Sequence, residues 1–253
     1  MSVRKAFPLH LSLVLLFLLP GAAFAGLTQQ QVEKLQLDLW QVRAEYHMNS
    51  VMEGSEEYQR ELSAALNQAR STFNEVSGAA ESEAARSLVN ELREDWQAIE
   101  GIGERALAAE GGRVDHYDRQ DLDHYTADMA LRLREFEGAS PGEYDDLWRM
   151  ATYMQRMTSE YLALAANPSG GMGTGTDAGR IDFHETVPAF DQMLEEARGE
   201  YGEDGTAQRA LEDIDARWNF IRESLINFHE DAVPFLVHRY NREIVNAFGE
   251  IAG

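Results

Sequence analysis

The 253-residue chain contains no cysteine. This excludes disulfide frameworks, cysteine zinc sites, thiol nucleophiles, haem attachment through CxxCH, and a lipoprotein acylated on cysteine. Lysine is almost as rare, because only Lys5 and Lys34 occur. Long hydrophobic runs are missing apart from one stretch near the N-terminus. We therefore expect no membrane span in the mature chain, since a spanning helix needs about 20 apolar residues.

Charge of one sign is also scarce. The chain has only 22 Lys and Arg residues against 44 Asp and Glu residues, which gives a formal net charge of −22 at pH 7. Nucleic acids and anionic membranes repel such a chain, so we expect no nucleic-acid partner. An apolar content of 44% with eleven Phe and four Trp is too high for a disordered acidic tail. The composition therefore predicts a folded, soluble, acidic protein.

The N-terminus has the features of a secretory leader. Arg4 and Lys5 precede an apolar stretch over residues 9–19, and Ala23-Phe24-Ala25 forms an A-x-A cleavage pattern. The apolar stretch is too short to cross a bilayer. The sequence thus predicts a signal peptide at residues 1–25, cut after Ala25, and a periplasmic or secreted protein.

Apolar residues recur at helical spacing through the rest of the chain. Val32, Leu35, Leu39, Val42 and Tyr46 follow a 3-4-3-4 pattern, whereas the alternation typical of half-buried strands is absent. This pattern predicts helices over residues 28–52, 55–77, 81–109, 114–137, 141–166, 183–201, 205–228 and 231–250. Pro141 is expected to start the fifth of them, because proline suits the first helical position.

The two halves of the chain share a pattern. Leu37-Asp38-Leu39-Trp40 recurs as Asp145-Asp146-Leu147-Trp148, and the residues around Trp96 resemble those around Trp218. Self-similarity on this scale indicates a duplicated module, although coincidence between two amphipathic helices would also explain it. We predict an all-α fold of two tandem antiparallel four-helix bundle modules, residues 26–138 and 139–253. The second contains a glycine-rich loop at 167–180, which lacks the G-K-[ST] ending of a phosphate loop.

The fifth predicted helix contains Arg149-Met150-Ala151-Thr152-Tyr153-Met154-Gln155-Arg156-Met157. This segment resembles the first helix of PilJ-type sensor domains, found in type IV pilus chemotaxis transducers and related to NarX-like helical nitrate sensors. Arg149, Gln155, Arg156 and Met157 match positions of the motif G-R-Q-R-M-L-S-Q-R-M. The resemblance implies a non-enzymatic helical sensor module. Ala151 stands where the relatives have their anion-contacting arginine, which argues against nitrate as the ligand.

Arg149 and Arg156 are the first candidates for ligand contact. They are seven residues apart, so they share one helix face. Two arginines that point between helices form an anion site through forked, charge-assisted hydrogen bonds. Gln155 and Trp148 complete the predicted ligand-binding set. The alternative is that both arginines pair with the abundant carboxylates.

A weaker pattern concerns metal binding. His116 and His124 are eight residues apart on a predicted helix and have aspartates around them. With carboxylates from another helix they would form a transition-metal site. The paired Glu-x-x-His motifs of di-iron bundles are absent, so we predict solvent-exposed or structural histidines, no metal and no cofactor.

No nucleophile elbow or Ser-His-Asp order occurs, and we predict that the protein is not an enzyme. The leading hypothesis is an exported sensor-like helical bundle that binds a small anionic ligand or a membrane-bound signalling partner such as a receptor. The alternatives are a periplasmic metal-binding bundle that uses His116 and His124, and an acidic adaptor that binds a basic partner.

Overall fold

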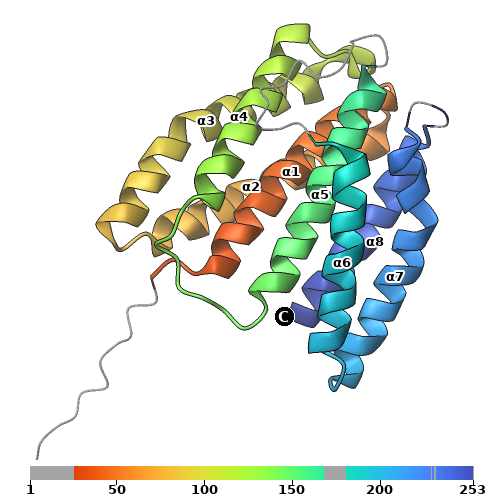
Figure 1. Ribbon diagram of the computed structural model, residues 1–253. Helices are drawn as coiled ribbons and strands as arrows, with labels where there is room; N and C mark the ends of the chain where they lie inside the picture. Colours follow the sequence, from red (N-terminus) through yellow and green to blue (C-terminus); the bar gives the residue numbers. More distant parts are fainter. Residues whose placement is uncertain (1–25, 168–180, 229, 231, 253) are drawn as a thin grey trace, which may run out of the picture.

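The computed structural model describes residues 26–167, 181–228, 230 and 232–252. The predicted signal peptide and most of the glycine-rich segment lie outside the described residues. Over the described ranges the chain is all-α, as predicted, with no β-strand (Figure 1). The elements are α1 (Gln29–Val51), α2 (Glu56–Ala79), α3 (Glu83–Ala108), the 3₁₀ turn η1 (Glu110–Gly112), α4 (His116–Arg134), α5 (Asp145–Ala166), α6 (Phe183–Glu200), α7 (Gly205–Ile226) and α8 (Pro234–Ala252).

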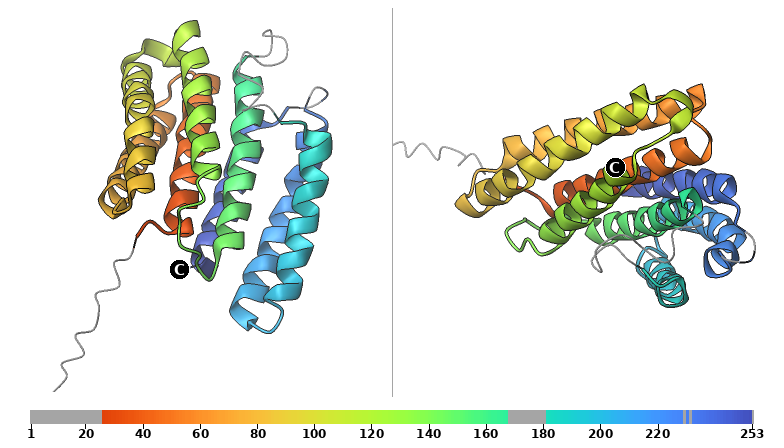
Figure 2. Two further views of the ribbon diagram at one scale, coloured as in Figure 1. Left: turned by 60° about the vertical axis from the view of Figure 1, so that its left-hand side comes forward. Right: turned by 90° about the horizontal axis from the view of Figure 1, so that it is seen from above.

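Helices α1–α4 lie on one side of the molecule and α5–α8 on the other (Figure 2). Helices α1 and α5 lie side by side in the middle, and theirs is the most extensive contact between any two of the described helices. They run parallel, because Lys34 lies against Trp148 near their starts and Arg43 bonds Glu160 further along both. Among the described residues, no helix is both long and apolar enough to cross a membrane.

The buried apolar side chains form two large cores. One is built by α1–α4 around residues such as Leu92 and Trp96, and the other by α5–α8 around residues such as Phe190 and Trp218. Helix α1 takes part in both, since Leu39 belongs to the first core and Met48 to the second. The duplication of the module itself stays a prediction.

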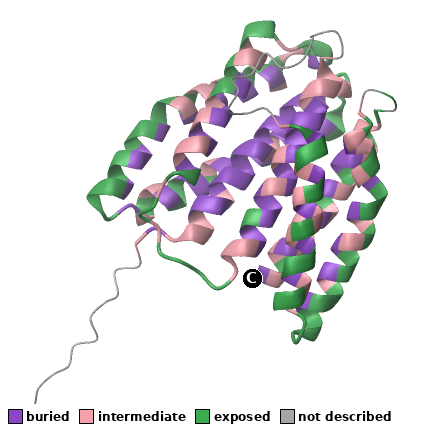
Figure 3. Cartoon of the chain, viewed as in Figure 1, coloured by how far each residue is buried: buried purple, intermediate pink, exposed green. Residues whose placement is uncertain are grey.

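Helix α1 is buried on almost every side (Figure 3). Charged and polar side chains on it, including Glu33, Arg43, Glu45 and His47, are each at most 6% exposed. Burying such groups costs free energy unless they are paired. The partners of these side chains therefore mark the polar contacts inside the protein.

One predicted helix start is wrong. Helix α5 begins at Asp145 and not at Pro141. The Ser140 N–H donates to the Leu27 carbonyl (2.9 Å), and the Ser140 carbonyl accepts from the Gln29 N–H (2.8 Å). This extended pairing with the start of α1 holds Ser140 out of helical geometry, so the chain turns before α5 begins. The other helices start or end within a few residues of their predicted limits.

Candidate anion-binding groove

A groove of about 430 Å³ lies between α4 and α5, with α1 as its floor. Its walls combine apolar, aromatic and charged side chains. The lining residues are Gln29, Glu33, Gln36 and Trp40 from α1, Ala127, Ala130, Leu131 and Arg134 from α4, and Arg149, Thr152, Tyr153 and Arg156 from α5.

Three arginines converge on this groove. Arg134 and Arg149 are exposed and form no hydrogen bond or ion pair within the part of the chain that the structure describes. Arg156 is half-buried, and burial followed by the nearby charge of Arg134 lowers its pKa. Like charges held this close repel one another, and an anion between them would relieve the repulsion.

Trp40 forms an aromatic wall beside these arginines. The guanidinium carbon of Arg156 lies 5.6 Å from the centre of its ring, and that of Arg43 lies 5.8 Å away. Both distances are within the range of cation–π attraction. Ala127 and Ala130 pack against the same indole. These contacts hold the side chain of Arg156 in place at the groove.

Glu33 is the single acidic residue among those that line the groove. It is 6% exposed, and burial raises its pKa, although Gln29 and Arg149 act in the opposite direction. Gln29 Nε2 donates to its Oε1 (3.1 Å), and Thr152 Oγ1 donates to its backbone carbonyl (3.2 Å). The only carboxylate that would repel an anion here is thus one that ionises less readily than usual.

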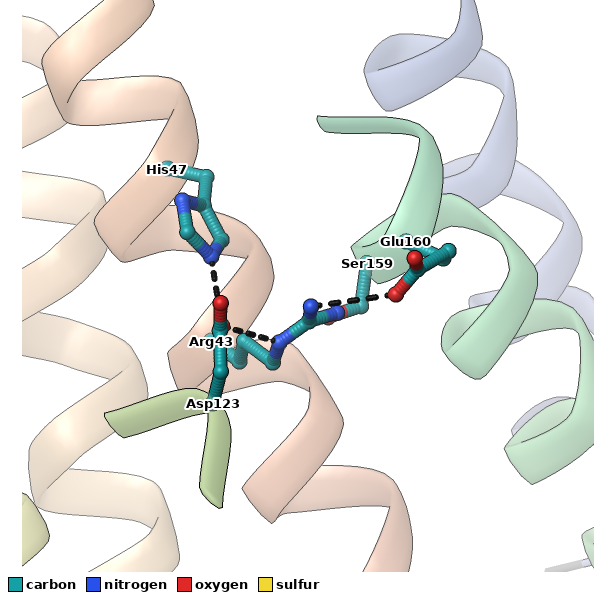
Figure 4. Close-up of polar contacts among 5 residues, drawn as sticks. All are labelled: Arg43, His47, Asp123, Ser159 and Glu160. Atoms are coloured by element: carbon teal, nitrogen blue, oxygen red, sulfur yellow. Dashed lines mark hydrogen bonds and ion pairs between the residues drawn. The ribbon is translucent and has the colours of Figure 1, made fainter. Parts of the chain in front are cut away.

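Beside the groove lies a buried network of five side chains (Figure 4). Each guanidinium nitrogen of Arg43 donates to one side chain: Nε to Asp123 Oδ1 (2.6 Å), Nη1 to Ser159 Oγ (3.0 Å) and Nη2 to Glu160 Oε2 (3.0 Å). His47 Nε2 lies 3.0 Å from the same Asp123 oxygen. The network joins α1, α4 and α5, which are the three helices that form the groove.

The charges of this network depend on one another. Burial acts to raise the pKa of Asp123, but Arg43 and His47 together hold it well below its ordinary value. Burial lowers the pKa of His47, against the pull of Asp123. Since every nitrogen of Arg43 already donates to a neighbour, this arginine fixes the walls of the groove and is not offered to a ligand.

The structure brings together two of the four predicted ligand residues. Arg149 and Arg156 both line the groove. Gln155 lies on another face of α5, where its Oε1 accepts from Asn241 Nδ2 (2.7 Å) on α8. Trp148 is 7% exposed, with Lys34 Nζ 4.4 Å from the centre of its ring. Gln155 and Trp148 therefore take part in helix packing, away from the groove.

The two histidines of the predicted metal alternative are not part of a metal-ligand group. His116 is exposed, with Nδ1 3.0 Å from Arg119 Nη2. The side chain of His124 is 47% exposed, and its Nε2 lies 3.5 Å from Asp128 Oδ2. Neither belongs to a group of three or more possible ligands among the described residues.

Sequence reasoning missed Arg134, Trp40 and Glu33. Their placement depends on which faces of α1 and α4 meet α5, and a single sequence carries no signal for that. Comparisons of the chain with protein-family models, with curated proteins and with solved structures give no match.

Proposed function

We propose that this protein is a non-enzymatic binding protein that takes a small organic anion in the groove between α1, α4 and α5. The observation that carries the proposal is the convergence of Arg134, Arg149 and Arg156 on one groove, in a chain whose net charge is −22. On so acidic a protein, a cationic groove with a single carboxylate is the opposite of the average surface.

The lining favours an organic anion. A guanidinium binds a carboxylate through two parallel hydrogen bonds, and three of them suit a ligand with one or two carboxylates. Trp40, Tyr153 and Leu131 offer apolar contact to the rest of the molecule. The volume of about 430 Å³ falls in the range of pockets that hold small molecules. A bare inorganic anion would leave the apolar side of the groove uncontacted.

The groove also supports a sensor-like role. In this proposal the protein is exported, with residues 1–25 as its signal peptide. Its walls come from α4 and α5, which belong to different sets of four helices. A ligand held by Arg134 on one wall and Arg156 on the other favours the packing in which both can reach it. The ligand shifts the equilibrium between the two helix packings by the difference in its affinity for them. A partner that binds only the favoured packing would then respond to the presence of the ligand.

The test is to titrate the protein with benzoate and with succinate, and with nitrate and phosphate as inorganic probes. Binding is measured by tryptophan fluorescence and by calorimetry. We expect at least one carboxylate to bind, and Arg134→Gln, Arg149→Gln and Arg156→Gln each to weaken it by about tenfold or more. Arg93→Gln is the matched control, because Arg93 is exposed on α3, away from the groove, and the change in charge is the same.

Two outcomes would contradict the proposal. One is that neither carboxylate binds the folded wild-type protein. The other is that Arg156→Gln and Arg93→Gln bind the carboxylate equally well. Binding of nitrate or phosphate alone, with the same dependence on the three arginines, would keep the groove as the site and replace the organic ligand with an inorganic one.

A further inference from the structure

A second cluster of polar side chains lies on the other side of α1 from the groove. Glu45 of α1, Glu61 of α2 and His238 of α8 bring one ligand atom each to within 4.8 Å of one another. They form the only group of three or more possible metal ligands among the residues that the structure describes. We propose that these three side chains bind one divalent transition-metal ion, with Zn²⁺ as the representative probe.

The spacing of the ligand atoms fits a metal of this size. His238 Nε2 lies 2.8 Å from Glu45 Oε1 and 3.7 Å from Glu61 Oε2. In a tetrahedral zinc site with bonds of 2.0–2.2 Å, ligand atoms lie about 3.4 Å apart. The observed distances bracket that value, so small rotations of the side chains bring all three atoms into coordination.

Two carboxylate oxygens at this place have no hydrogen-bond donor. Glu45 is 2% exposed, and its Oε2 is buried and accepts no hydrogen bond. Glu61 Oε2 is also buried and accepts no hydrogen bond. Arg242 pairs with the other oxygen of this carboxylate, Oε1. Buried carboxylate oxygens normally find a hydrogen-bond donor or a metal, and here the imidazole ring of His238 lies beside both carboxylates.

The donor set selects the class of metal. One imidazole and two carboxylates suit Zn²⁺, Mn²⁺ or Fe²⁺ better than Mg²⁺ or Ca²⁺, which prefer oxygen ligands alone. The two carboxylates balance the charge of a divalent ion. A cavity of about 330 Å³, lined by His238 and Glu61, adjoins the cluster and gives room for water as a further ligand. This is an open site of three protein ligands.

The test is calorimetric titration of the protein with Zn²⁺ in 150 mM salt, with Mn²⁺, Mg²⁺ and Ca²⁺ as comparison. We expect one Zn²⁺ per chain, removed by EDTA and bound at least tenfold more tightly than Mg²⁺ or Ca²⁺. Glu45→Gln, Glu61→Gln and His238→Gln should each weaken Zn²⁺ at least tenfold. Glu57→Gln is the matched control, because Glu57 is exposed and lines the same cavity without belonging to the cluster.

Circular dichroism establishes which variants fold, and the conclusion rests on those that do. The nearly isosteric Glu→Gln changes preserve packing even where His238→Gln does not. The proposal is overturned if the wild-type protein binds no stoichiometric Zn²⁺, or if folded Glu45→Gln and Glu61→Gln bind it as tightly as Glu57→Gln. It is independent of the anion groove, so Arg149→Gln should bind Zn²⁺ like the wild type.

Discussion

Asp38 is an acid held where it does not readily ionise. It is 6% exposed, and its Oδ2 accepts a hydrogen bond from Thr72 Oγ1 (2.6 Å). Burial raises its pKa from 3.8 to about 6, even though Thr72 and the charge of Lys34 act to lower it. The folded state therefore binds this proton more tightly than the unfolded chain does. The stability that results is complete below pH 3.8 and is lost as the pH rises through about 6.

We expect Asp38→Asn to stabilise the protein at neutral pH. The amide oxygen still accepts from Thr72, and no buried charge has to form. At pH 7.5 the free energy of unfolding should rise by about 3 kcal/mol, because the pKa is raised by about two units and each unit is worth about 1.4 kcal/mol. The gain should disappear towards pH 4. Urea unfolding at both pH values measures it, with exposed Asp121→Asn as the control. An equal effect of Asp38→Asn at both pH values would contradict the assignment.

At the scale of the elements, the turn that follows α1 packs closely against the turn η1, with one glycine on each side of the contact. Gly54 and Gly112 have φ values of +67° and +64°, which L side chains rarely adopt. A Cβ on Gly112 would lie 2.4 Å from Gly54 N and 2.8 Å from the Asn49 carbonyl oxygen. The backbone segments can approach this closely only because neither residue carries a side chain.

Gly112→Ala should therefore destabilise the protein by about 2 kcal/mol or more, from backbone strain and steric overlap together. Gly78→Ala is a matched comparison, because Gly78 lies in α2 and a Cβ there meets no atom within 4 Å. That change should stabilise by up to about 1 kcal/mol through helix propensity. Thermal unfolding of the two variants gives the signs, and a neutral Gly112→Ala would show that the turn moves freely.

The helices were predictable from the sequence because a 3.6-residue period is local. The start of α5 was not, because it depends on Ser140 pairing with residues at the start of α1. The residues of the groove differ in the same way in whether the sequence could place them together. Arg149 and Arg156 share a face by their spacing alone, whereas Arg134 joins them only through the packing of α4 against α1. Glu45 and His238 are 193 residues apart, so no spacing rule could connect them.

At the scale of the whole molecule, the two cores are joined through helix α1, which contributes side chains to both. Met48 and Ala44 of α1 belong to the core built by α5–α8, and Arg43 bonds Glu160 in the interior. Removing either half would leave these side chains without their partners. We expect one cooperative transition in scanning calorimetry, with the van't Hoff enthalpy equal to the calorimetric enthalpy. Two resolved transitions would mean that each half is stable alone.

The burial of α1 on nearly every side has a consequence for hydrogen exchange. An outer helix such as α3 or α7 can fray or open locally, and its amide protons then exchange with solvent while the rest of the protein stays folded. This local route is largely closed to the middle of α1, residues 35–48, because the helices on both sides cover nearly all of its side chains. Deuterium should thus enter this part of α1 last, at a rate set by the unfolding of the entire molecule.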